Sequence, residues 1–181
     1  KTLEGLLFPD TYTFSGGTDA MHVVRIMRAN FERVVGPIIA HLSPKDKEKI
    51  LVIASFVEKE ARYPKDRAVV ASVIYERLAL GMPLQIDAAN VYVKCKGAYL
   101  TCPAVDRVLT KADLALDGPY NTYVRGGLPI TPIANAGVDA IRAAIAPKST
   151  ANLYYISNPT TGRLIFAETL EEHNENRQKY H

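Results

Sequence analysis

The chain has 181 residues, of which 48% are apolar and 23% are charged, and its formal net charge is +3. This balance is typical of a globular domain with its own hydrophobic core. The charge is too small to indicate nucleic-acid binding. The longest apolar stretch, Ile50–Val57, is far shorter than the roughly 20 residues of a membrane span.

The first half of the sequence predicts three helices. Each is bounded by residue types that cap, open or stop a helix, and each carries apolar residues at helical spacing. Ser43-Pro44 is the clearest start, with serine at the N-cap and proline at the first helical position. In chain order we expect a loop or short strand over 1–17, a helix from Thr18 to the break at Gly36-Pro37, a helix over 44–62, and a helix over 66–80 before Gly81.

The second half begins with a long irregular region, residues 82–135, in which short extended pieces such as Val91–Val93 alternate with Pro, Gly and Asn. Loops of this length in a domain are usually functional or disordered. A short helix, an antiparallel hairpin and a last helix opened by the Thr169-x-x-Glu172 capping box complete the pattern. They are expected over 138–146, over 152–157 with 163–167, and from 169 onward. The predicted fold class is therefore α+β, rich in helix, with a small antiparallel sheet.

Glu60 stands out because it is a carboxylate on an apolar helix face. It follows Ile53 by seven residues, Phe56 by four and Val57 by three, whereas Glu58 lies about 160–200° away around the helix. Burial raises the pKa of a carboxyl group, which is what a general acid needs near neutral pH. The competing interpretation is a solvated helix end, or an ion pair with Arg62 or Arg67.

Other common kinds of site are not indicated. The four histidines, at 22, 41, 173 and 181, have no metal-ligand spacing. The sequence lacks the G-x-S-x-G elbow of α/β-hydrolases and a phosphate-binding glycine loop. Cys95 and Cys102 flank a short polar loop, and they are either free thiols or a disulfide formed in an oxidising compartment.

Several segments together resemble one family, the endolytic murein transglycosylases called YceG-like or MltG. The similarity runs in order along nearly the whole chain. The matching segments are Leu3–Tyr12 (LEGLLFPDTY), Ala54–Glu60 (ASFVEKE), Val70–Leu78 (VASVIYERL), Gly81–Asp87 (GMPLQID), Tyr120–Tyr123 (YNTY), Gly127–Pro129 (GLP) and His173-Asn174. The sequence departs from the family pattern at Glu76, at Ala88-Ala89 and at the Cys95–Cys102 loop.

The resemblance implies a lysozyme-like catalytic domain spanning residues 1–181, a fragment without the family's N-terminal membrane anchor and LysM-like portion. It implies an enzyme of the bacterial inner membrane, with one span and its catalytic domain on the periplasmic side. Such an enzyme cuts the bond between N-acetylmuramic acid and N-acetylglucosamine and leaves a 1,6-anhydro end. By the family motif the catalytic acid is Glu60, without metal or cofactor. The expected partners are glycan strands and cell-wall synthases, and an oxidising location favours the disulfide.

Candidate substrate-binding residues come from the motifs outside the helical periodicity. Amide, hydroxyl and aromatic groups in a rigid loop suit a sugar, and the alternative is that Asp87 and Asn121 are turn-forming residues. The set is Glu58, Gln85, Asp87, Tyr120, Asn121 and Thr122. Two other functions remain open: a hydrolytic muramidase, with Asp87 as the second carboxylate, and an inactive glycan-binding module.

Overall fold

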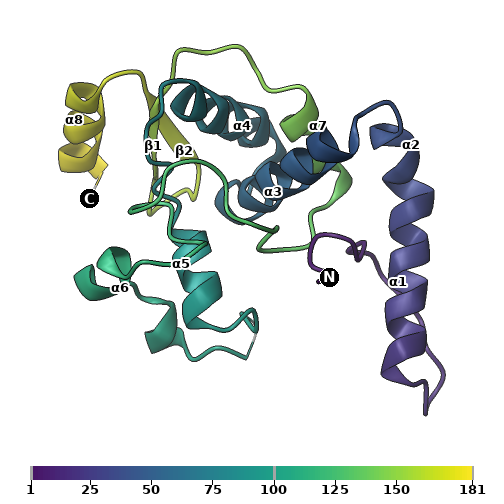
Figure 1. Cartoon of the computed structure of the whole chain (residues 1–181). Helices are drawn as coiled ribbons and strands as arrows, with labels where there is room; N and C mark the ends of the chain where they lie inside the picture. The colour runs from purple at the N-terminus through teal and green to yellow at the C-terminus, as the bar shows by residue number, and fades with distance from the viewer. Residues whose placement is uncertain (1, 100, 181) are drawn as a thin grey trace.

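The computed structural model describes residues 2–99 and 101–180, without the side chain of Asp106. Lys1, Leu100 and His181 lie outside the described residues. Helices dominate, and a two-stranded sheet lies between the helical core and the C-terminal helix (Figure 1). The elements are α1 (Ala20–Val34), α2 (Gly36–Ile39), α3 (Pro44–Glu60), α4 (Pro64–Ala79), α5 (Asp87–Lys94), the 3₁₀ helix η1 (Ala104–Arg107), α6 (Lys111–Ala115), α7 (Val138–Ile145), β1 (Tyr154–Ser157), β2 (Leu164–Ala167) and α8 (Leu170–Tyr180).

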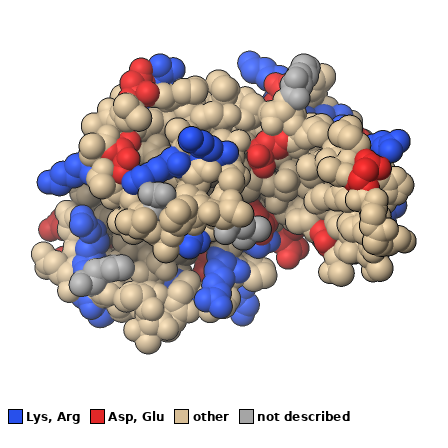
Figure 2. All heavy atoms as spheres, turned by 90° about the horizontal axis from the view of Figure 1, so that it is seen from below, with Lys and Arg blue, Asp and Glu red and all other residues tan. Residues whose placement is uncertain are grey.

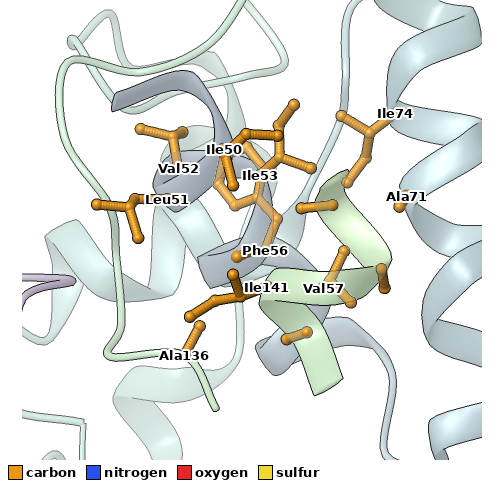
Figure 3. Packing of buried hydrophobic residues seen from close by; sticks show 14 of the residues in the cluster. Ile50, Leu51, Val52, Ile53, Phe56, Val57, Ala71, Ile74, Ala136 and Ile141 are labelled. Atoms are coloured by element: carbon orange, nitrogen blue, oxygen red, sulfur yellow. The ribbon is translucent and has the colours of Figure 1, made fainter. Parts of the chain in front are cut away.

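Helix α3 is the centre of the core. Its residues from Ile50 to Val57 are all buried, and Ile53, Phe56 and Val57 have no exposed surface. Figure 3 shows these side chains packed against Ala71 and Ile74 of α4 and Ile141 of α7. Burial on all sides is typical of a helix enclosed by others. The last residue of α3, Glu60, is therefore held at the end of a rigid element.

The hairpin and the last helix have the predicted form. Strands β1 and β2 are antiparallel, with Tyr154 opposite Ala167 and Ser157 opposite Leu164. Asp66, buried at the start of α4, accepts hydrogen bonds from Arg163 and from the Leu164 backbone N–H, which fastens β2 to α4. The Thr169–Glu172 capping box is present at the start of α8. The α+β class is confirmed.

The other boundaries differ modestly from the predictions. Ser43 caps α3 as expected, but Asp19 rather than Thr18 caps α1. The predicted break at Gly36-Pro37 ends α1, but a short helix, α2, begins at Gly36 itself. Its proline lies in the first turn, where a missing N–H costs nothing. Gly81 takes the left-handed conformation (φ +67°) expected after a helix end.

The prediction of an irregular region over 82–135 is wrong in part. Residues 87–94, including the expected extended piece Val91–Val93, form helix α5, and η1 and α6 follow. The alternation Val-Tyr-Val suggested a strand, but helical packing places Ala89, Asn90 and Val91 in the interior. Tertiary contacts have here overridden the β-propensity of the branched residues.

No helix within residues 2–99 and 101–180 is long and apolar enough to cross a lipid bilayer. On the face shown in Figure 2, the Lys and Arg side chains are scattered among neutral and acidic residues instead of forming one continuous basic surface.

Candidate active site

A cleft of about 620 Å³ lies where the end of α3 meets the hairpin, α8 and the segment that leads into α5. Its volume is within the roughly 300–1,000 Å³ of small-ligand sites. Glu60 lines it together with two of the other predicted residues, Gln85 and Asp87. The remaining lining residues are Arg77, Leu84, Tyr123, Tyr155, Ile156, Ser157, Leu164, His173 and Arg177.

The Glu60 carboxyl group has an unusually high pKa. This pKa is raised from 4.5 to about 7, mainly by burial. Hydrogen bonds from the Tyr155 hydroxyl and the Ala88 backbone N–H oppose this shift, and the negative charge of Asp87 adds to it. The Tyr155 oxygen lies 3.1 Å from Glu60 Oε2. A helix C-terminus also disfavours a negative charge. Near neutral pH, Glu60 can therefore both donate and accept a proton.

Tyr155 is a dependable donor to this carboxyl group. Burial and the neighbouring Glu60 charge raise the pKa of Tyr155 well above its usual value. The hydroxyl therefore keeps its proton at neutral pH. Strand β1 supplies Tyr155, and its ring is tilted against Phe166 on β2, with centroids 6.1 Å apart. The hairpin thus sets the position of the hydrogen bond to Glu60.

Asp87 begins α5 and lines the cleft together with Glu60. The Tyr123 hydroxyl donates a hydrogen bond to Asp87 Oδ1 at 2.5 Å. Burial and this contact with Asp87 raise the pKa of Tyr123, so that its hydroxyl remains a donor. The cleft therefore contains two carboxyl groups, each hydrogen-bonded to a tyrosine.

Arg77 links two backbone segments that border the cleft. This buried guanidinium donates to the Leu153 carbonyl at 2.7 Å and to the Pro83 and Leu84 carbonyls at 3.1 and 3.0 Å. It also reaches Gln85 Oε1 at 3.4 Å. Gln85 itself adopts a positive φ of 53°, a conformation that non-glycine residues rarely take and that marks functional segments.

The structure does not place Asn121 and Thr122 in the cleft. The Asn121 amide donates to the Leu114 and Leu116 carbonyls at 2.9 and 2.7 Å. The Thr122 hydroxyl accepts from the Ile86 N–H at 2.8 Å. Both side chains are buried. Thr122 thereby braces the backbone between Gln85 and Asp87. Asn121 braces the preceding segment 114–116, which agrees with its turn-forming interpretation, whereas Asp87 lines the cleft.

Tyr120 and Glu58 also lie outside the residues that line the cleft. The Tyr120 ring packs on Tyr92, with centroids 5.2 Å apart, and its hydroxyl is 2.6 Å from that of Thr131. Glu58 pairs with Arg67 at 3.1 Å and accepts from the Gly137 N–H at 3.0 Å. Glu58 thereby joins α3 to Gly137, the N-cap residue of α7. Glu60, in contrast, has no ion pair with a described basic residue, so the predicted alternative with Arg62 or Arg67 is wrong.

Sequence reasoning did not identify Arg77, Tyr123, Tyr155 or Arg177. Arg77 and Tyr123 lie inside the matched segments, so the motifs carried a signal for them. Tyr155 and Arg177 come from the hairpin and α8, whose approach to α3 is a tertiary property. His173, which belongs to a matched pair, stacks on Tyr154 with centroids 5.3 Å apart.

Cys95 and Cys102 form a disulfide, with Cα atoms 5.4 Å apart. They pack with Val91 and Leu109 in a small apolar cluster separate from the main core. As for metals, the part of the chain that the structure describes brings no three His, Cys, Asp or Glu side chains together in a way that could hold an ion.

The profile of the YceG-like family matches residues 1–179 of the chain. The chain belongs to the YceG-like family. The endolytic murein transglycosylase of Bacillus subtilis (strain 168) is 39% identical over 183 residues, which cover 98% of this chain and 48% of the relative. The endolytic murein transglycosylase of Streptococcus pneumoniae (strain D39) is 34% identical, over 96% of this chain and 31% of that protein.

The fold is also similar to that of a solved YceG-like protein. The crystal structure of the YceG-like protein from Listeria monocytogenes superimposes with a TM-score of 0.82 at 38% sequence identity. The match covers 96% of this chain and 55% of the Listeria chain. This YceG-like chain thus spans about half the length of the B. subtilis relative, and less of the pneumococcal one.

Proposed function

We propose that this domain is an endolytic lytic transglycosylase that cuts peptidoglycan glycan strands between N-acetylmuramic acid and N-acetylglucosamine. The observation that carries the proposal is the Glu60 carboxyl group, with a pKa of about 7, in a cleft large enough for sugars. The relatives described above support it, since they bear the name endolytic murein transglycosylase.

The reaction uses one acid that becomes a base. Protonated Glu60 donates its proton to the glycosidic oxygen, and the bond from that oxygen to the anomeric carbon of muramic acid breaks. The 6-hydroxyl oxygen of the same sugar then bonds to the anomeric carbon, and the Glu60 carboxylate accepts the hydroxyl proton. The product is a 1,6-anhydro end, and Glu60 returns to its protonated form. A pKa of about 7 suits both steps at neutral pH.

The other cleft residues assist this cycle. The Tyr155 hydroxyl stabilises the carboxylate form of Glu60 after the first proton transfer. The Asp87 charge stabilises positive charge that develops on the muramic ring as the bond breaks. Arg77 and the buried Thr122 hold the backbone on either side of Gln85, at Leu84 and Ile86, and so fix the segment that leads into Asp87.

Hydrolysis is the second candidate, because Asp87 is available as a second carboxylate. Product analysis separates the two reactions. Purified, uncrosslinked glycan strands are digested, and the new ends are identified by mass spectrometry. A transglycosylase gives an anhydro end, which is one water lighter than the reducing end left by a hydrolase. A predominance of reducing ends would overturn the proposal, and no cleavage by folded protein would favour a glycan-binding module.

We place the domain outside the cytoplasmic membrane as part of the same proposal. Disulfides persist in oxidising compartments, and Cys95–Cys102 is such a bond. A membrane anchor and contact with cell-wall synthases would follow from the family resemblance. Alkylation of exported protein without reductant, followed by intact-mass measurement, tests whether Cys95 and Cys102 are bonded there. Two alkylated thiols would contradict the proposed oxidising location.

A further inference from the structure

A second hollow of about 710 Å³ lies on the other side of the α3 terminus from the cleft. Its walls include Lys59 on α3, Tyr92 on α5, the loop closed by the Cys95–Cys102 disulfide, and Asn135 before α7. Helix α5 packs against α3 at this point (Figure 1). Glu60, Asp87, Tyr123 and Tyr155 line the cleft and are not among the residues that line this hollow.

The two hollows are lined by neighbouring residues at the end of α3 and the start of α5. Glu60 and Asp87 line the cleft, and their chain neighbours Lys59 and Ala88 line the second hollow. The Ala88 N–H is also a hydrogen-bond donor to the Glu60 carboxyl group. The end of α3 and the start of α5 therefore border both hollows, and the proton-transferring group Glu60 faces the cleft beside this boundary.

The chemistry of the second hollow suits a sugar chain. Tyr92 and Tyr99 contribute aromatic surface, and Tyr99 is 40% exposed. Lys59 Nζ lies 4.0 Å from the Tyr99 ring centroid, which holds the lysine against this ring of the hollow. Burial raises the pKa of Glu4, whose carboxyl group accepts a hydrogen bond from Tyr92. Aromatic faces beside a few polar groups are typical of built small-ligand sites.

We infer that the second hollow binds the leaving half of the glycan strand, the sugars on the N-acetylglucosamine side of the bond that is cut. This inference rests on the proposed function, because a cut within a strand requires sugars on both sides of the acid. The direction follows from Asp87. The muramic ring gains positive charge as the bond breaks, so it belongs in the cleft with Asp87. The leaving sugar then belongs in the second hollow.

The disulfide gives this hollow its outer wall. Ala98 and Tyr99 lie between the two cysteines and face the hollow. The Ala98 carbonyl accepts the N–H groups of Thr101 and Cys102, which makes the loop a tight turn. Because Ala98 uses only its backbone carbonyl in these hydrogen bonds, a larger side chain at this position can enter the hollow without removing them.

The test compares a substitution that fills the hollow with a matched substitution outside it. Ala98→Trp places a large side chain in the hollow, whereas Val105→Trp places the same side chain on η1, where Val105 is 74% exposed. Each change is combined with Glu60→Gln, so that binding of an intact decasaccharide of alternating N-acetylglucosamine and N-acetylmuramic acid is measured without cleavage. We expect Ala98→Trp to weaken binding by about tenfold or more, as loss of a central contact region does, and Val105→Trp to leave it unchanged.

The direction is tested with active protein and a decasaccharide labelled at its reducing end. Ala98→Trp should move the cuts toward the reducing end, because fewer sugars are then held on the leaving side. Movement toward the opposite end, or equal behaviour of the Ala98→Trp and Val105→Trp proteins, would overturn the inference. If Ala98→Trp does not fold, Tyr99→Ala is used with the same expectations. Cleavage that survives Glu60→Gln would refute the proposed function instead, so the two failures are distinguishable.

Discussion

Two groups of polar side chains singled out by the sequence or the cleft differ in what they contact. Glu60, with Tyr155 and Asp87, faces the cleft and has part of its hydrogen-bonding capacity open to a substrate. Glu58 and Asn121 direct their polar atoms at backbone groups and a partner charge inside the protein. Similar residue types thus serve either chemistry or bracing, and the contacts decide which.

The largest expected effect is the loss of activity in Glu60→Gln. The amide keeps the shape of the side chain but cannot transfer a proton, so turnover of glycan strands should fall by about 10²–10⁴-fold. Glycan end-group release measures it. Activity within about tenfold of the unsubstituted protein would remove Glu60 from the catalytic role.

Glu60→Gln should also change how stability depends on pH. The folded state raises the pKa of Glu60 from 4.5 to about 7, so the folded protein binds more protons than the unfolded chain between these values. Glu60 therefore reduces stability as pH rises through this window. Denaturant unfolding at several pH values should show a smaller decline for Glu60→Gln. An equal or steeper decline would contradict the raised pKa.

Asn121→Ala should act on stability and not on the chemical step. It leaves the Leu114 and Leu116 carbonyls and the Tyr123 N–H without their partner, the Asn121 side chain. The free energy of unfolding should fall by about 2 kcal/mol. Urea denaturation measures this loss, and turnover at a temperature where the variant is folded should stay near normal. Lost turnover in a fully stable protein would place Asn121 among the substrate-binding residues.

Glu58→Gln is the matched control for Glu60→Gln, two residues away on the same helix. The amide can still accept from the Gly137 N–H but loses the charge that pairs with Arg67. We expect a loss of about 1 kcal/mol in the free energy of unfolding. Cleavage should remain within about tenfold, since no proton-transfer group is removed. A loss as large as that of Glu60→Gln would abolish the distinction between the two faces.

The smallest expected effects are opposite shifts in the pH profile. Cleavage should decline as pH rises through about 7, because the acid is then deprotonated. Tyr155→Phe removes a hydrogen bond that lowers the pKa of Glu60, and Asp87→Asn removes a charge that raises it. The decline should move by about half a unit to one unit, upward for Tyr155→Phe and downward for Asp87→Asn. Shifts in the same direction would rule out this arrangement.

Much of the fold followed from local sequence signals. The Ser43-Pro44 start, the hairpin and the Thr169–Glu172 capping box depend on contacts within a few residues, and all three are present. Helix α5 did not follow, because its sequence resembles a strand and its helical form depends on burial against the rest of the domain.

The site was predictable to the same limited extent. The position of Glu60 on an apolar helix face, which is a local property, singled it out, and the family motif assigned it the catalytic role. Tyr155 was not, because its hydrogen bond joins residues 95 positions apart. Asn121 and Thr122 were recognised as special by their motif, but a sequence does not say whether an amide faces a sugar or a carbonyl group.

Direct titration of the Glu60 carboxyl group is the most decisive measurement. Carbon-13 NMR of glutamate-labelled protein follows each carboxyl signal with pH, and the signal missing from Glu60→Gln identifies Glu60. The account predicts a midpoint near 7 that coincides with the decline of cleavage. A midpoint near the ordinary 4.5 would contradict the claim that the folded cleft prepares Glu60 as the acid.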